Sequence, residues 1–284
     1  GIISSKAKIG KILLQKAEVA VDEEEYPENV EVVLKYVSSA ETFLRIEEIL
    51  RMGGVLPPGE NEPEQHNTRV IAVFSPIGGC GKSLVSYALA KKLRKLDQKV
   101  LLVGCDATQS VGVFFPDGIF AREELIDQLS RPGEETYWTI LQNVGQYDAI
   151  SYLLPFEKTL STLEMDPQKW ELFLTVLTQK HDSDFIILDV GNVLNRATAS
   201  LMGKSDYLIL LTETNLIANR KMQKLLRDSD LLPNCECILL ANEYRADGMR
   251  IAAESVFGTI SPYPDWEEAL EDPVFYQIAL KVTE

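Results

Sequence analysis

Continuous apolar runs alternate with helical segments along most of the chain, from residue 68 onward. Runs of this kind are typical of parallel strands that are buried on both faces. Their alternation with helices predicts an α/β fold with a doubly wound, mostly parallel sheet. The predicted strands lie near residues 69–74, 99–103, 184–188, 206–211, 236–241 and 257–260. Between residues 115 and 165 the pattern is weak and predicts only turns and a short helix near 139–144.

The first 67 residues have a different pattern. A strand-like run covers residues 30–36, and the capping box Ser38–Glu41 predicts a helix that continues to about Met52. Residues 53–67 are rich in glycine, proline and acidic residues and predict a linker. We therefore expect an α/β segment over residues 1–52, a linker over 53–67 and a large domain over 68–284.

The first strand of the large domain continues into a glycine-rich turn that ends in Lys82 and Ser83. Glycines let the backbone N–H groups of such a loop converge on a phosphate, and the helix that follows adds its positive N-terminal end. In this setting Lys82 is expected to reach the β- and γ-phosphates, and the Ser83 hydroxyl to bind Mg²⁺. The residues predicted to contact ATP or ADP here are Gly78, Gly79, Cys80, Gly81, Lys82, Ser83 and Leu84.

Two later strands each end in an aspartate, Asp106 and Asp189. Ligands of open α/β sheets bind at this end of the strands. Asp106 is expected to orient a water near the γ-phosphate, and Lys82 with Asp106 forms the predicted catalytic pair. Ser83, Asp106 and Asp189 form the predicted Mg²⁺ site, which needs few direct carboxylates. The alternative for each aspartate is that it caps the next helix.

In these features the chain resembles the MinD/ParA group of P-loop ATPases over about residues 68–281. The deviant Walker A motif of that group matches the loop except at Ile77, where the group has a lysine. The resemblance implies that Asn242, at the end of a strand, and Pro264, in a late loop, contact the base. Within the group, the loop is most similar to the branch of TadZ and CpaE, which places pilus and secretion machinery.

That branch joins a degenerate receiver domain to its ATPase-like domain. The resemblance implies that residues 1–52 are the last part of such a domain, without its phosphoacceptor aspartate. Such a short fragment cannot bury a full core, so it is expected to pack on the ATPase domain or in a dimer interface.

The resemblance also implies a homodimer that forms with ATP-Mg²⁺ and positions or assembles a pilus, secretion or polar machinery. In the group, the lysine that Ile77 replaces reaches the phosphates of the partner subunit. A cation supplied in this way is worth roughly 10³–10⁵ in rate, so its loss predicts weak ATP hydrolysis. One alternative is a scaffold that holds ATP without hydrolysing it. A bacterial tyrosine kinase is disfavoured, because only Tyr263 and Tyr276 follow Tyr244. A metabolic ligase rests on the fold alone.

The formal net charge of −15 disfavours nonspecific nucleic-acid binding. We interpret the run Lys91–Lys95 as a solvated helix face, and residues 271–284 lack the basic charge of a membrane-binding helix. No apolar run approaches the ~20 residues that span a bilayer, and the N-terminus lacks a secretory signal. We therefore expect a cytoplasmic protein, recruited to a cell pole or a membrane-bound machinery through protein partners.

The four cysteines are consistent with a reducing compartment. Cys235 and Cys237 share one face of a predicted strand and are expected to pack in the core. With only two histidines in the chain, they do not predict a metal site.

Overall fold

The computed structural model describes residues 12–16, 30–34, 67–108, 110–227, 232, 235–242 and 256–284. The chain divides into two compact units, residues 1–66 and 67–284. In the first unit, β1 (Ile12–Lys16) pairs in parallel with β2 (Val30–Leu34). The strand expected near residues 30–36 is thus present as β2, whereas β1 was not predicted. The predicted helix through Met52 and the linker up to residue 66 lie outside the described residues.

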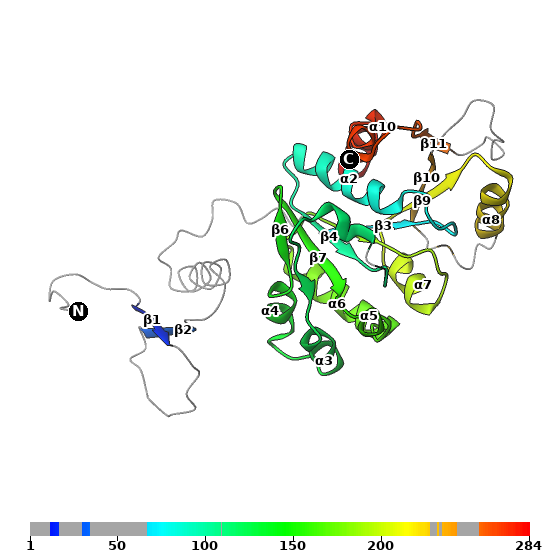
Figure 1. Ribbon diagram of the computed structural model, residues 1–284. Helices are drawn as coiled ribbons and strands as arrows, with labels where there is room; N and C mark the ends of the chain where they lie inside the picture. The colour runs from blue at the N-terminus through cyan, green and yellow to red at the C-terminus, as the bar shows by residue number, and fades with distance from the viewer. Residues whose placement is uncertain are drawn as a thin grey trace. The chain divides into compact units, whose positions relative to one another are not determined.

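The second unit is built on a nine-stranded sheet with the order β11-β10-β9-β3-β8-β4-β7-β5, and β6 pairs with β7 (Figure 1). All pairs are parallel except β6 with β7. This confirms the predicted α/β fold. The strands are β3 (Arg69–Phe74), β4 (Val100–Gly104), β5 (Phe120–Ala121), β6 (Gly145–Tyr147), β7 (Ile150–Phe156), β8 (Phe185–Asp189), β9 (Tyr207–Glu213), β10 (Glu236–Asn242) and β11 (Val256–Thr259).

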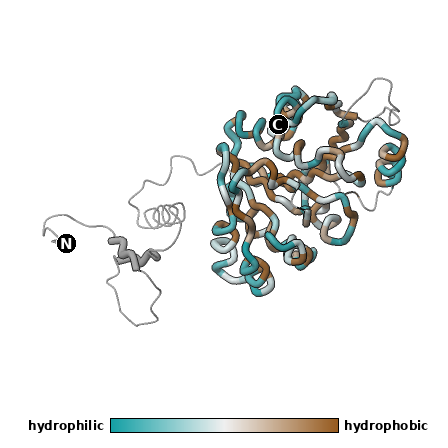
Figure 2. Tube along the Cα trace, in the orientation of Figure 1, coloured by the Kyte–Doolittle hydropathy of each residue, from teal (hydrophilic) through white to brown (hydrophobic). Residues whose placement is uncertain are grey.

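Helices cover both faces of this sheet, so the strands form the hydrophobic interior of the unit (Figure 2). The helices are α2 (Lys82–Lys95), the 3-10 helix η1 (Ser110–Phe114), α3 (Glu124–Ser130), α4 (Thr136–Leu141), α5 (Thr159–Leu163), α6 (Pro167–Lys180), α7 (Arg196–Gly203), α8 (Leu216–Arg227), α9 (Trp266–Ala269) and α10 (Pro273–Thr283). None of the described helices is both long and apolar enough to cross a membrane.

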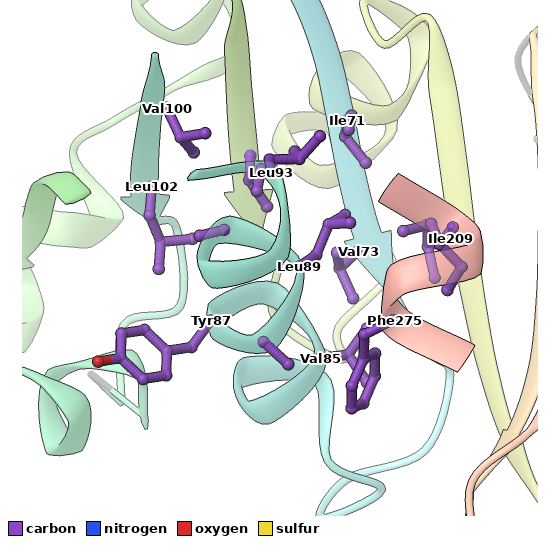
Figure 3. Packing of buried hydrophobic residues seen from close by; sticks show 14 of the residues in the cluster. Ile71, Val73, Val85, Tyr87, Leu89, Leu93, Val100, Leu102, Ile209 and Phe275 are labelled. Carbon is purple, nitrogen blue, oxygen red and sulfur yellow. The ribbon is translucent and has the colours of Figure 1, made fainter. Parts of the chain in front are cut away.

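Side chains that alternate along the strands divide the core between the two faces. Ile71 and Val73 of β3 pack with α2 and α10, as Figure 3 shows for Leu89 and Phe275. The intervening β3 residue Ala72 packs on the other face, with α3, α6, α7 and α8. Each face of the central strand is therefore anchored by helices, which holds the carboxyl end of β3 in place.

Helix α10 uses its apolar face to pack against α2. Phe275 is fully buried there. Lys92, on α2, is also buried, and its Nζ lies 2.7 Å from the exposed Glu271 carboxylate just before α10. The run Lys91–Lys95 is therefore not simply a solvated face, because its second lysine ties the two helices together.

The segment from residue 115 to 165 holds more structure than its pattern predicts. It contains β7, which pairs with β4 inside the sheet, as well as β5 and β6. The predicted short helix is present as α4, which begins three residues earlier, at Thr136. Within this segment Phe115 stacks on Tyr152 of β7 with ring centroids 4.2 Å apart, and just before it Phe114 stacks on Tyr87 of α2 at 4.6 Å.

The core position predicted for Cys237 is wrong, whereas Cys235 packs against the core as predicted. Cys237 is exposed and Cys235 is half-buried. Cys235 precedes β10 and Cys237 is its second residue, and both come before Leu239, where the pairing of β10 with β11 begins. Within the described part of the chain, the first residues of β10 thus have no paired β11 residue beside them.

Candidate functional site

The loop of residues 75–83, here called the phosphate loop, connects β3 to α2. Its first residue is anchored to the neighbouring strand, because Ser75 Oγ donates a hydrogen bond of 2.7 Å to the Leu211 carbonyl of β9. The Ile77 N–H in turn donates to Ser75 Oγ at 3.1 Å. The loop therefore leaves the sheet in a fixed direction, at the edge where parallel α/β sheets bind ligands.

Two glycines give the phosphate loop its shape. Gly79 and Gly81 have φ values of 75° and 90°, in the region that favours glycine. A Cβ atom at Gly81 would lie 2.5 Å from the Asn242 amide nitrogen, so only glycine fits there. Gly78 and Gly79 are exposed, and Gly79 has no neighbour within 4 Å of a Cβ. The exposed part of the loop thus has room for a phosphate beside its backbone.

Asn242, at the end of β10, holds the same loop from the other side. Its buried Nδ2 donates a hydrogen bond of 2.8 Å to the Cys80 carbonyl. Asn242 was predicted to contact the base. In the structure its side chain bonds the phosphate loop. Pro264 is exposed in the loop after β11. That loop begins beside the end of β10, where the Ile260 N–H donates to the Ala241 carbonyl at 2.9 Å.

Asp189 lies under the phosphate loop and is almost fully buried. It accepts a 2.6 Å hydrogen bond from Ser83 Oγ and a longer one, 3.4 Å, from Ser86 Oγ. Burial raises the pKa of the Asp189 carboxyl to about 6, although the Ser83 hydrogen bond and the charge of Lys82 lower it. A cation placed beside Ser83 would favour the ionised carboxylate, so this pair of side chains fits a bound Mg²⁺.

The carboxylate of Asp106 is held by its own turn. It accepts hydrogen bonds from the Thr108 N–H at 3.1 Å, from Thr108 Oγ1 at 2.7 Å and from Ser110 Oγ at 3.2 Å. The only backbone N–H among these donors belongs to Thr108, which lies before η1 begins at Ser110, so these bonds fix the turn and do not cap the helix. The loop after β8 passes close by, because a Cβ on Gly191 would lie 3.5 Å from Asp106 Oδ1. Of the predicted set Ser83, Asp106 and Asp189, the structure thus joins Ser83 to Asp189 by a hydrogen bond and places the Asp106 carboxylate near that of Asp189.

Lys82 and Cys80 complete the electrostatics of the loop. Lys82 is buried as the first residue of α2, and its charge lowers the pKa of both Asp189 and Cys80. For Cys80 the larger effect is burial, which raises the pKa of its thiol. The Cys80 thiol thus stays protonated at neutral pH, and it donates a weak hydrogen bond of 3.4 Å to the Ile77 carbonyl.

Ile77, inside the phosphate loop, and Leu84, in the first turn of α2, are half-buried. Both pack against the core on the face of α2 and α10. The side chain at position 77 thus contributes to packing. Leu84 was predicted to contact the nucleotide, and its described surroundings are hydrophobic.

A divalent cation at this site would have few protein ligands. No group of three or more His, Cys, Asp or Glu side chains suited to a metal ion occurs among the described residues. The site instead offers one hydroxyl, Ser83, beside one buried carboxylate, Asp189. This matches the chemistry of Mg²⁺, which keeps several waters and takes its other ligands from substrate phosphates.

Two further residues contact the site and were not predicted. Ser86 lies three residues after Ser83, so it shares a helix face with it, and its hydroxyl also bonds the Lys82 carbonyl at 3.0 Å. That spacing was visible in the sequence. Asn192 follows Gly191, and its amide nitrogen lies 3.4 Å from the position of a Cβ at Gly78. No sequence signal distinguishes Asn192 from other polar loop residues.

Comparisons with known proteins agree with this fold. The family model described as an AAA domain matches residues 68–235. No curated protein sequence matches the chain. Solved structures with the same fold include a putative plasmid partition protein from Borrelia burgdorferi B31 bound to AMPPNP, with 17% identity and a TM-score of 0.59; the match covers 77% of this chain and 100% of that one.

Two further structures are similar to the same extent. The septum site-determining protein MinD from Pyrococcus horikoshii OT3, complexed with Mg-ADP, has 20% identity and a TM-score of 0.59, and the match covers 76% of this chain and 96% of that one. A ParA family ATPase from Chlorobium tepidum TLS has 19% identity and a TM-score of 0.57, over 76% of this chain and 92% of that one. At these identities the similarity establishes the fold.

Proposed function

The chain belongs to the AAA domain family, and from that premise we propose that it is an ATP-binding switch protein of the MinD/ParA type with weak ATPase activity. The observation that carries the proposal is the 2.6 Å hydrogen bond between Ser83 Oγ and Asp189 Oδ2, directly below a glycine-rich loop. This hydrogen bond places a hydroxyl that can bind Mg²⁺ next to a buried carboxylate at the end of a parallel strand. The AMPPNP and Mg-ADP in two structures of the same fold support the choice of ligand.

In this proposal, the exposed loop amides and the Lys82 ammonium bind the phosphates of ATP. Ser83 and Asp189 hold Mg²⁺, which when bound neutralises charge on the β- and γ-phosphates. Asp106 lies beside the loop after β8 and orients a water near the γ-phosphate. Asn242 keeps the phosphate loop in its binding shape through its bond to the Cys80 carbonyl.

Hydrolysis is proposed to be slow because Ile77 cannot supply positive charge to a neighbouring phosphate. Its side chain packs against the core instead. The loss of a cation that acts across a dimer costs roughly 10³–10⁵ in rate. Phosphate release measured on wild type and on Asp106→Ala tests this. Slow release that disappears in Asp106→Ala supports a weak ATPase, whereas no release from wild type supports a scaffold that only holds ATP.

We also propose that ATP-Mg²⁺ drives formation of a homodimer, which positions or assembles a pilus, secretion or polar machinery through protein partners. Nucleotide switches act by ordering the segments that contact the γ-phosphate. Here those segments are the phosphate loop and the residues after Asp189. No nucleic acid or membrane is a direct ligand in this proposal.

Gel filtration tests the switch. Wild type run with ATP-Mg²⁺, with ADP-Mg²⁺ and without nucleotide is expected to elute earlier only with ATP. Lys82→Ala is expected to elute at the nucleotide-free position in all three conditions. Lys91→Ala is the matched control, because Lys91 lies on the same helix but pairs with Asp148 at 3.2 Å. An elution volume of wild type that is the same in all conditions would contradict the switch.

A further inference from the structure

A cavity of about 430 Å³ lies beside the phosphate loop, on the face of the sheet opposite α2. Its apolar wall is formed by Phe74 at the end of β3, Pro76 in the phosphate loop, Leu194 after β8 and Leu225 on α8. Phe74 and Leu225 are buried core residues, whereas Leu194 is 41% exposed. The volume falls within the ~300–1,000 Å³ of typical ligand pockets.

The rest of the wall is basic. Arg220, Lys221 and Lys224 of α8 line the cavity, and all three are exposed. Helix α8 contains a fourth cation, Arg227, and no acidic residue, although the whole chain has a net charge of −15. Within the part of the chain that the structure describes, Arg220 and Lys221 take part in no ion pair. Basic side chains of α8 thus border an apolar cavity on one side, in an acidic protein.

Exposed apolar side chains extend this surface on two sides. Ile217 is 71% exposed and lies three and four residues before Arg220 and Lys221, so it shares their stripe on the helix. Val193, next to Leu194, is 62% exposed. Basic side chains such as Arg220 and Lys221, combined with exposed branched side chains, are typical of a surface that buries a partner.

We propose that this surface, formed by the cavity, Ile217 and Val193, docks an acidic amphipathic segment of a partner protein. Apolar side chains of the segment would fill the cavity, and its carboxylates would pair with Arg220 and Lys221. Charge complementarity selects such a partner over a basic or neutral one. A nucleic acid would pair with the same cations but would leave the apolar wall unfilled, which disfavours it.

The position of the surface connects it to the proposed nucleotide switch, and this part of the inference rests on the proposed function. Pro76 belongs to the phosphate loop, and Leu194 follows Asp189 by five residues. A ligand that changes the conformation of either segment therefore changes a wall of the cavity. The affinity for the docked segment is therefore expected to differ between the ATP-bound and nucleotide-free protein.

The test measures fluorescence anisotropy of a labelled synthetic peptide with the full chain. In the peptide, leucines recur at i, i+3, i+4 and i+7 and the other positions are glutamate. Wild type is expected to bind it saturably, and Arg220→Glu and Lys221→Glu each to weaken binding about fivefold. Leu194→Ser is expected to weaken it by a similar factor. Lys204→Glu, at the end of α7 away from the cavity, is the matched control and should bind as wild type does.

Several results would overturn the docking proposal. One is no saturable binding to wild type up to about 1 mM peptide. Another is equal binding of a peptide with lysine in place of glutamate, or unchanged affinity in both charge reversals. Binding of a 20-base-pair DNA duplex or of phosphatidylglycerol vesicles, lost in Arg220→Glu and Lys221→Glu while the peptide does not bind, would assign the surface to those ligands instead. Urea unfolding of each variant verifies that it is folded.

A second series separates docking from the nucleotide switch. Lys82→Ala without nucleotide is expected to bind the peptide as wild type does, because Lys82 does not line the cavity. Added ATP-Mg²⁺ is expected to change the peptide affinity of wild type and not of Lys82→Ala. Peptide binding that ignores ATP in wild type would overturn the coupling while leaving the docking surface in place.

Discussion

Replacing Asp189 by asparagine tests how the buried carboxylate affects the nucleotide-free protein. The pKa of Asp189 is raised from 3.8 to about 6, chiefly by burial. One pKa unit corresponds to about 1.4 kcal/mol, so the ionised carboxylate costs the folded state up to about 3 kcal/mol above pH 6. Asparagine keeps a similar shape and carries no charge. We therefore expect Asp189→Asn to be more stable than wild type at neutral pH, without nucleotide.

The sign of the pH dependence follows from the raised pKa. The folded state binds the Asp189 proton more tightly than the unfolded state, so this contribution to stability is complete below the unfolded pKa of 3.8. It is lost as pH rises through 6. The advantage of Asp189→Asn in free energy of unfolding should grow from about 1.5 kcal/mol at pH 5 to about 3 kcal/mol at pH 8.

The assay is urea unfolding followed by tryptophan fluorescence at several pH values. All three tryptophans, Trp138, Trp170 and Trp266, lie in the unit of residues 67–284, so the signal reports the unit that contains Asp189. Saturating ATP-Mg²⁺ is expected to stabilise wild type and not Asp189→Asn. A stability difference that is equal at pH 5 and pH 8, or a variant less stable than wild type at pH 8, would refute the reasoning.

Two other substitutions test the geometry around the site. Gly81→Ala places a Cβ 2.5 Å from the Asn242 amide at a φ of 90°, so we expect it to lower nucleotide affinity at least about tenfold and stability by about 1–3 kcal/mol. Calorimetric nucleotide titration and urea unfolding measure this, and unchanged affinity would contradict the role of the loop shape. Lys92→Ala removes a buried side chain of α2 whose ammonium pairs with the Glu271 carboxylate, and it should cost about 1–2 kcal/mol in urea unfolding. Lys95 is exposed and lies 3.5 Å from the same carboxylate, so Lys95→Ala should cost less than about 0.5 kcal/mol. An equal loss of stability in the two variants would show that burial of the lysine does not set the size of the effect.

The strands that the sequence predicts well are those with unbroken apolar runs. Residues 185–188 read Phe-Ile-Ile-Leu and are buried on both faces, so composition alone identified β8. Strand β7 reads ISYLLPF, and it was not predicted because a proline interrupts the strand-like run. Pro155 lacks an N–H donor and lies between Leu154 and Phe156, where the pairing with β5 shifts register. The irregular register of β5 makes room for the proline in β7. The residues around Pro155 give no sign of this pairing, so the sequence does not predict it.

The residues of the candidate site were predictable where a short stretch of sequence, such as a glycine-rich turn or the end of an apolar run, marks them. Glycine spacing located the phosphate loop, and strand ends located Asp106 and Asp189. The bond from Asn242 to Cys80 spans 162 residues, so its geometry emerges only from the folded sheet. The basic surface of α8 was missed for a related reason. Arg220, Lys221 and Lys224 lie close together in the sequence, but only the folded chain places them beside the apolar cavity that Phe74, Pro76 and Leu194 help to form.

The measurement that tests the central claim most directly is calorimetric titration of the full chain with ATP-Mg²⁺. We expect one nucleotide per chain, with Lys82→Ala losing at least about tenfold in affinity and Lys91→Ala binding as wild type does. That result would place the nucleotide on the loop between β3 and α2. Absence of binding to wild type, or equal affinity of Lys82→Ala, would contradict the account.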